Sequence, residues 1–540
     1  MSQAPEEKEL HTEHHEHAHE HGHTKTIAGV DEHLAAALVA RGNPNPFGRG
    51  YLKLYFFCFL IFFASTMNGF DGALMGSINA LPNYTSYYHL PPKGNSATGI
   101  VFAIFNIGQM VGSLFIWLAD WKGRKLPIFV GCLGVIVGTV ITSTAPTLSV
   151  FVGGRFLLSF FSTVATTAAP LYMIEIAPPL YRGTIAGMYN TLWYLGSIIA
   201  TSAVYGANLN LSTDGQVNWR LPLWLQMVCP AIVLFGVWFC PESPRYLVGK
   251  GRSVEARAIL VRFHANGDET HPLVDLQMKE MEEALQREGM LTWRNFLDVR
   301  SLFRTRGRAY RMMLNMAFSW FGQFSGNNIA SYYLPKLLSN VGITTVNTQL
   351  ELNIVYSVLG YVAAVTGSRF HDILGRRTMF LISISGMIIS LSIAAGTAAG
   401  YVHTGSFASS AASIAFIYVF GVSYSWAFTS MHPIYPGEVM ANDMRAKGMC
   451  VSGLVSGIAS FVNTFAAPVA LNNIGYWFYA FFALWDCFEL AFVYFFFVET
   501  KGRTLEELEE IFNSPNPRKA SVKLVTVKAG SDDSSMDEKV

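Results

Sequence analysis

Charged residues are scarce in this chain. They make up 14% of it and hydrophobic residues 51%, whereas charged residues are about a quarter of an ordinary soluble protein. The formal net charge of +1 neither favours nor excludes a nucleic-acid partner, and no basic residues cluster enough to suggest one. We therefore expect a membrane protein that lies in the lipid bilayer. We expect no nucleic-acid partner.

Cysteine is also rare, and patterns typical of enzymes are missing. The six cysteines fall in apolar stretches and show no spacing typical of a metal or redox site, so we expect no disulfide framework. No nucleophile–base or phosphate-binding constellation indicates an enzyme or a cofactor. The first fifty residues are polar and lack a signal-peptide pattern, so the first apolar segment is expected to stay as a membrane anchor.

What the chain has instead is a succession of apolar segments of about twenty residues, the length that spans a bilayer. They lie at about 51–77, 97–119, 126–145, 148–174, 184–206, 221–240, 309–335, 350–370, 377–400, 409–436, 447–471 and 476–498. We predict an all-α membrane protein with twelve transmembrane helices in two six-helix halves. The expected regions are a disordered His-rich N-terminus (1–50), the first half (51–240), a linker of amphipathic helices (241–308), the second half (309–498) and a tail (499–540).

Basic residues are concentrated in alternate loops, which predicts that both termini are cytoplasmic, with the plasma membrane as the expected location. Two sequons, at Asn83 and Asn210, fall on the opposite side and are candidate glycosylation sites. Seven histidines between His11 and His23 suggest either a solvated low-complexity terminus or a metal-buffering tail. A zinc carrier is not supported, because the spans lack clustered His and Asp ligands, and we expect no metal site.

Clusters of acidic and basic residues occur twice in the same order, about one half-chain apart. The separations are 252 residues from Gly123 to Gly375, 263 from Glu175 to Glu438 and 257 from Glu242 to Glu499. Internal repeats around a central site are typical of secondary transporters. We therefore expect a carrier that works by alternating access.

These clusters, with Pro241-Glu242-Ser243-Pro244-Arg245 and Glu499-Thr500-Lys501-Gly502-Arg503, resemble the sugar porter family of the major facilitator superfamily over roughly residues 50–513. Three further segments resemble the fungal lactose and cellodextrin permease branch: 189–193, 263–268 and 322–328. The resemblance implies a sugar and protons as partners and a functional monomer.

The repeated charges are expected to form pairs that hold the two halves together on the cytoplasmic side and break when the halves rock apart. In the family such pairs latch the outward-facing state; alternatively, basic loops merely fix orientation. One departure from the family is Trp121, which replaces an arginine. The gating candidates are Asp120, Arg124, Glu175, Arg182, Glu242, Arg245, Asp372, Arg376, Glu438, Arg445 and Glu499.

Two charges lie inside spans, Asp71 in the first and Arg155 in the fourth. Ionisable groups at membrane depth are expensive, usually paired and usually functional. Residues at these positions couple sugar to proton transport in proton-coupled members of the family, which makes Asp71 and Arg155 candidates for coupling. A static buried ion pair is the alternative.

A sugar site needs amides, which both donate and accept, together with an aromatic wall. Asn190, Gln323, Asn328 and Asn463 match sugar-binding positions of the family. Asn190 and Gly322 replace glutamines of the family, which removes bulk and favours a disaccharide. His432 stands where relatives have an amide and is either a ligand or a packing residue, and Trp426, Tyr332 and Tyr333 are candidate stacking groups.

The predicted function is import of a disaccharide such as lactose or cellobiose by proton symport. The alternatives are a passive hexose or pentose facilitator, a sugar sensor that does not transport, and an exporter of natural products, because one fold serves many functions.

Overall fold

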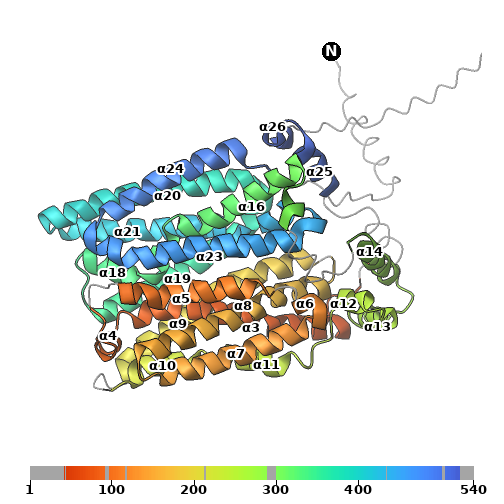
Figure 1. Ribbon diagram of the computed structural model, residues 1–540, viewed down its shortest axis with the longest axis horizontal. Coiled ribbons are helices and arrows are strands. Elements are labelled where there is room, and N and C mark those ends of the chain that lie inside the picture. The colour runs from red at the N-terminus through yellow and green to blue at the C-terminus, as the bar shows by residue number, and fades with distance from the viewer. Residues whose placement is uncertain are drawn as a thin grey trace, which may run out of the picture.

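The structure is a computed structural model that describes residues 42, 44–91, 96–115, 118–179, 181–211, 215–288, 299–432, 434–501 and 505–522. Most of the predicted N-terminal segment and of the C-terminal tail lie outside these residues. Every regular element among the described residues is a helix. Figure 1 shows the long helices side by side in one bundle, with the helices of the first half below those of the second. Short helices gather at one end, which we call the linker end.

The first half contains long helices that follow the first six predicted spans. Their bounds are α3 Arg49–Ile78, α5 Ser96–Ser113, α7 Lys125–Thr144, α8 Leu148–Ile176, α9 Arg182–Asn210, α10 Val217–Leu225 and α11 Val228–Gly236. Two short helices lie between them, α4 Pro82–Tyr87 and α6 Leu118–Lys122. The sixth predicted span is thus built from two consecutive helices.

The second half repeats this plan with more interruptions. Its helices are α16 Arg306–Phe324, α17 Asn327–Tyr332, α18 Leu334–Asn340, α19 Val346–Leu374, α20 Arg376–Thr404, α21 Phe407–Tyr424, the π-helix η2 Ser425–Thr429, α22 Ile434–Val439, α23 Asn442–Asn473 and α24 Trp477–Phe496. Each of the twelve predicted spans overlaps a helix or a run of consecutive helices. Within the described residues, nine helices are long and apolar enough to cross a membrane, and Ala97–Ser113 is a shorter apolar one.

The seventh span is broken at a glycine. α16 ends at Phe324 and α17 begins at Asn327, and between them Gly326 has a φ of 91°. Residues with a side chain rarely adopt this left-handed conformation, whereas glycine does so at little cost. The break places Gln323 and Asn328 on either side of a joint in the helix.

Small residues bring α3 and α9 into backbone contact. A Cβ added to Gly69 would overlap the carbonyl of Trp193 in α9, and one added to Gly196 would overlap the carbonyl of Thr66 in α3. Such close approach is typical of helix packing in membranes. The helix that carries Asp71 is therefore fixed against its neighbour.

The predicted linker of short helices is present at the linker end (Figure 1). It comprises α12 Pro244–Gly249, α13 Ser253–His264, α14 Pro272–Glu288 and the 3₁₀ helix η1 Val299–Phe303, and α25 Leu505–Asn513 and α26 Pro517–Val522 lie at the same end. The buried ring of His264 joins α13 to the first half, since its Nε2 lies 2.9 Å from the Ile176 carbonyl at the end of α8. The linker thus contacts the first half at Ile176, the residue that follows Glu175.

Candidate substrate, coupling and gating sites

One polar cluster of the first half is centred on Arg124, at the start of α7. Its Nε and one Nη each lie 2.8 Å from the Glu175 carboxylate, which comes from the end of α8. The backbone N–H of Arg124 donates to Glu242 over 3.1 Å, and the Ser243 hydroxyl donates to Glu175. A bidentate, charge-assisted pair of this kind fixes geometry as well as adding energy. Three segments of the first half are joined at this point.

The second half repeats the cluster residue for residue. Arg376 donates to the two Glu438 oxygens over 2.7 and 3.0 Å, and its backbone N–H donates to Glu499 over 2.8 Å. The Thr500 hydroxyl takes the place of the serine and donates to Glu438 over 2.6 Å. The repeat seen in the sequence is therefore also a repeat of hydrogen-bond geometry.

Arg124 thus pairs with Glu175, and Arg376 with Glu438. The expected pairing of each arginine with the acid of its own loop, Arg124 with Asp120 and Arg376 with Asp372, involves acids whose side chains lie outside the described residues, and it stays a prediction. Both members of each pair belong to the same half. These two pairs therefore hold helices of one half together, and they are not the expected contacts between halves.

The other gating candidates occupy the same end of the bundle. Arg245 is exposed on α12, and Arg445 is half-buried near the start of α23. The side chains of Asp120, Arg182 and Asp372 lie outside the part of the chain that the structure describes. Their roles remain predictions.

Hydrogen bonds between α9 and α19, and between α5 and α23, join the halves. The hydroxyls of Ser197 and Ser357 lie 2.9 Å apart, and Asn208 donates to Asn347 over 2.8 Å. Tyr205 donates to Glu351 at an exposed position. These contacts must break if the halves separate along this interface.

Asp71 and Arg155 form a buried ion pair. An Nη of Arg155, in α8, lies 3.2 Å from Oδ1 of Asp71, in α3, and the two side chains are only 3% and 2% exposed. Gln226 donates to the same oxygen over 2.6 Å, while Oδ2 of Asp71 has no partner among the described residues. Asp71 and Arg155 are thus in contact, and their role in coupling stays a prediction. Gln226 was not predicted, although an amide inside an apolar span is the signal that could have identified it.

Three of the predicted sugar-binding amides come together at the break in the seventh span. The Gln323 carbonyl accepts hydrogen bonds from Asn328 and Asn463, over 3.2 and 2.9 Å. Asn328 also donates to the Ser460 hydroxyl in α23 over 3.0 Å. Oδ1 of Asn463 is buried and without a partner among the described residues, so it can accept a hydrogen bond from a ligand hydroxyl.

A fourth amide, Asn106, joins this group from the first half. It donates to Thr464 over 2.9 Å and accepts from Ser460 over 3.0 Å, both in α23. Its presence in an apolar span made it recognisable by the criterion that identified Asn190, but it was missed. We call Asn106, Gln323, Asn328, Ser460 and Asn463 the amide cluster.

Asn190, Trp426 and His432 belong to a different set of contacts. Asn190, in α9, donates to the Thr429 carbonyl in η2 over 2.6 Å, across the two halves. Trp426 is half-buried, with its ring 5.8 Å from that of Phe370. His432 is solvent-accessible and packs beside Phe318 of α16, with the ring centroids 6.1 Å apart. A π-helix often marks a functional site; η2 contains Trp426 and Thr429, and His432 follows it by three residues.

The candidate glycosylation sites lie away from the linker end. Asn83 is half-buried in α4, which Figure 1 places at the opposite end of the bundle, and it donates to the Gly215 carbonyl over 3.4 Å. Asn210 is exposed at the last residue of α9. Their use as acceptors remains a prediction.

Two repeated helical halves that enclose a buried ion pair and a cluster of amides define a secondary transporter. The chain belongs to the family described as "Sugar (and other) transporter", which matches residues 57–512. It is accordingly a multi-pass membrane transporter and not an enzyme.

Curated relatives include transporters of several fungi. The chain is 29% identical to the high-affinity glucose transporter of Kluyveromyces lactis over 479 residues, which are 85% of each protein. It is 25% identical to the quinate permease of Neurospora terricola, over 87% of this chain and 90% of that one. None of these names indicates the lactose and cellodextrin branch.

Among solved structures, the chain resembles the xylose transporter XylE of E. coli in a partially occluded inward-open conformation. The TM-score is 0.69 at 18% identity, over 84% of this chain and 99% of XylE. This likeness establishes the major facilitator fold that the sequence predicts.

Proposed function

We propose that this protein imports a sugar together with protons, by alternating access across the plasma membrane, with both termini in the cytoplasm. The observation that carries the proposal is the Asp71–Arg155 pair in the first half, together with the amide cluster, whose members come from both halves. Arg155 lies 5.3 Å from the ring of Phe105, the residue before Asn106 of that cluster. Neither element alone indicates symport. Together they provide a group that can bind a proton and groups that can bind hydroxyls.

The coupling group is suited to gain and lose a proton. Arg155 and Gln226 stabilise the carboxylate of Asp71, whereas burial favours its neutral form, so small changes in wetting shift the balance. Protonation would remove the charge that holds Arg155. The pair can therefore change its geometry with its protonation state.

The helix that carries Asp71 packs against the broken span. A Cβ added to Gly76 in α3 would lie 3.0 Å from the Tyr332 carbonyl at the end of α17, and Ser77 accepts a hydrogen bond of 2.9 Å from Asn353. Asn328 lies on the same short helix, α17. A movement of α17 on sugar binding would thus be transmitted to α3, the helix that carries Asp71.

The finer proposal is that the sugar is a disaccharide. At Gly322 an added Cβ would lie 3.8 Å from the Phe428 ring and 4.0 Å from the Tyr424 hydroxyl, which is ordinary contact distance, and the absence of the family's glutamine side chain removes bulk at this point. Asn190 is shorter than the glutamine of relatives. The named relatives, including a Saccharomyces cerevisiae hexose transporter, favour a hexose as the second candidate.

The test is uptake in a yeast that lacks its own sugar carriers. Cells expressing the chain are given labelled glucose, xylose, lactose or cellobiose while extracellular pH is recorded. We expect saturable uptake of a disaccharide with transient alkalinisation of the medium. Uptake without a pH change would identify a passive facilitator, uptake of monosaccharides alone would refute the disaccharide, and binding without uptake would identify a sensor. Efflux of a natural product without sugar uptake would identify an exporter.

A further inference from the structure

Two acidic residues lie inside α24, the last helix of the second half. Asp486 is the tenth of its 20 residues, so both Asp486 and Glu489 lie near the middle of the span. Both side chains are 0% exposed, which excludes contact with lipid or bulk water. A spacing of three residues places them on the same face of the helix.

These carboxyls lack the partners that buried acids normally have. Trp485 donates its indole N–H to Oε1 of Glu489 over 2.6 Å. Both oxygens of Asp486 and Oε2 of Glu489 have no hydrogen-bond partner within the described ranges. Asp71 of the first half, by contrast, is held by an arginine and a glutamine.

The arginines of the helices packed around α24 lie near the linker end, whereas the titratable His403 lies at the other end of α20, with its ring 6.4 Å from that of Tyr476 just before α24. α20 contributes Arg376, bound to Glu438 and Glu499, and Arg377, whose guanidinium lies over the Tyr494 ring. α16 contributes its terminal arginines, among them Arg311, which lies over the Phe512 ring, and Tyr310. The group of α21 within electrostatic range of Glu489 is the hydroxyl of Tyr424. The cations named here belong to the helix ends, whereas the acids lie near the middle of the span.

Two adjacent carboxylates cannot both remain ionised in such a place. An unpaired buried charge carries a desolvation penalty of several kcal/mol, and a second negative charge beside it adds repulsion. A proton can neutralise a buried carboxylate, because it needs neither a cavity nor further coordinating groups. We propose that Asp486 and Glu489 form a second proton-binding site, in the second half of the transporter, which holds at least one proton in the described state.

Side chains around the two acids of α24 contact the end of α16, which carries part of the amide cluster. Tyr424 donates its hydroxyl to the Gly322 carbonyl over 2.6 Å, and the next residue, Gln323, accepts from Asn328 and Asn463. The ring of Trp485 also packs against that of Phe324, the last residue of α16, with centroids 5.2 Å apart. A change in charge on Glu489 therefore acts on the end of α16 that carries the amides.

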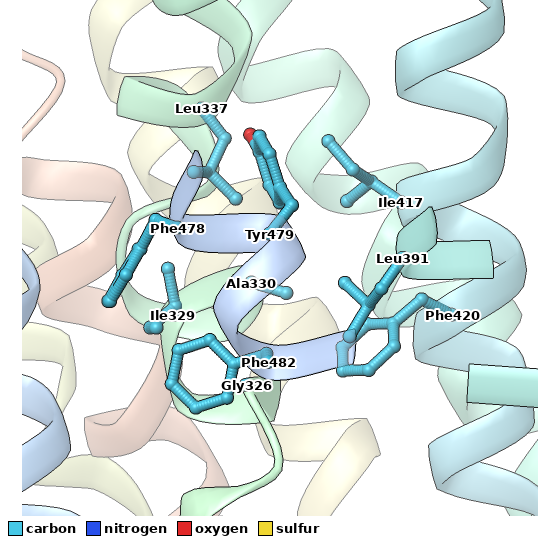
Figure 2. Close-up of a pocket in the computed structure, with 10 residues that line it drawn as sticks. All are labelled: Gly326, Ile329, Ala330, Leu337, Leu391, Ile417, Phe420, Phe478, Tyr479 and Phe482. Atoms are coloured by element: carbon cyan, nitrogen blue, oxygen red, sulfur yellow. The ribbon is translucent and has the colours of Figure 1, made fainter. Parts of the chain in front are cut away.

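A small apolar pocket lies between α24 and the break in the seventh span. Its lining includes Tyr479 and Phe482 of α24 together with Gly326 and Ile329, and Figure 2 shows the Phe482 ring beside Gly326. Phe482 lies one turn before Asp486 on the same helix, and its ring contacts the glycine at which the seventh span breaks. A change of charge at the second proton site can therefore act on the break between α16 and α17. This role rests on the sugar transport proposed above.

The test of proton binding is infrared spectroscopy of the purified full-length protein in lipid vesicles at neutral pH. The parent should show the carbonyl stretch of a protonated carboxylic acid, which shifts in heavy water. Asp486→Asn and Glu489→Gln should each reduce or abolish this band, and Asp275→Asn, at an exposed residue paired with Arg257, should leave it unchanged. Glu489→Gln keeps an oxygen for the Trp485 bond and so tests the site if Asp486→Asn fails to fold. Identical bands in the parent and both α24 variants would overturn the site.

The link to transport is tested separately by sugar affinity across pH. Removing both acids should abolish the part of the pH dependence that survives Asp71→Asn. An unchanged pH profile would overturn the link. A parent that binds no sugar would refute the proposed function, while the infrared band would still decide the proton site.

Discussion

The Ser460 hydroxyl in α23 donates a hydrogen bond of 3.0 Å to Oδ1 of Asn106 in α5. The bond crosses the interface between the two halves and ends in the amide cluster, since Ser460 also accepts from Asn328. Substrate binding and contact between the halves therefore share atoms. A ligand that competes for Asn328 alters the bonding of Asn106, which belongs to the other half.

Replacing Asn106 is expected to weaken both substrate binding and the contact between the two halves. Asn106→Leu removes one hydrogen bond from each of the Ser460 and Thr464 hydroxyls, which keep their bonds to Asn328 and to the Ser460 carbonyl, and each lost bond costs about 0.5–1.5 kcal/mol. We expect KM for the sugar to rise by about tenfold or more, since 1.4 kcal/mol corresponds to a factor of ten. Uptake kinetics measure this, with Asn210→Gln at an exposed position as the control.

Asp71→Asn should uncouple sugar from protons. The amide is close in shape to the carboxylate but cannot exchange a proton, so the variant should equilibrate sugar without accumulating it against a gradient. The measurement is sugar accumulation in vesicles with an imposed pH difference, compared with Asp275→Asn. Equal accumulation by parent and Asp71→Asn would contradict the coupling role.

The arginine–glutamate pair of the first half should contribute more to stability than its counterpart in the second half. Breaking a buried pair by removing one partner costs about 3–5 kcal/mol, and the 27% exposure of Glu438, against 10% for Glu175, lowers the expected value for the second half. Double-mutant cycles of Arg124→Gln with Glu175→Gln, and of Arg376→Gln with Glu438→Gln, measure this through thermal stability. Coupling near zero in both cycles would show that the pairs do not hold the halves rigid.

Gly322 should control the size of the sugar. Gly322→Ala is expected to be tolerated, because the new Cβ finds ordinary contacts at 3.8 Å and beyond, whereas Gly322→Gln fills the space and should favour monosaccharides. The ratio of disaccharide to hexose kcat/KM for the two variants measures the effect. An unchanged ratio in Gly322→Gln would remove this position from the site.

His432 tests whether the segment that follows η2 contacts the substrate. Its accessible ring is available to a ligand, so His432→Ala should raise KM for the transported sugar. His432→Gln, which restores the amide of relatives, should recover most of the affinity. Unchanged affinity for every transported sugar in His432→Ala would assign the ring to packing beside Phe318.

Much of the fold could be predicted, because spans of apolar residues must form helices in lipid. The break at Gly326 could not, since a glycine in a span is compatible with a continuous helix and no local pattern indicates its positive φ. The π-helix that contains Trp426 could not be predicted for the same reason. Both interruptions are set by tertiary contacts that local sequence does not contain.

The candidate site was predicted unevenly. The charges in the spans pointed to Asp71 and Arg155, whose pairing the structure shows. The same criterion applied to α24 would have identified Asp486 and Glu489, and applied to amides it would have identified Asn106 and Gln226. The partners of Arg124 and Arg376 were beyond the sequence, since residues separated by 51 and 62 positions bind each other.

The hydrogen bonds that cross between the halves have a consequence for the speed of the cycle. Those of Asn106, Ser197 and Asn353 join uncharged groups, and each contributes about 0.5–1.5 kcal/mol. Thermal motion alone can exchange such bonds, and dissolved ions do not screen them. The rate at which the carrier reorients should therefore depend only weakly on ionic strength, through charged contacts such as the exposed Tyr205–Glu351 bond.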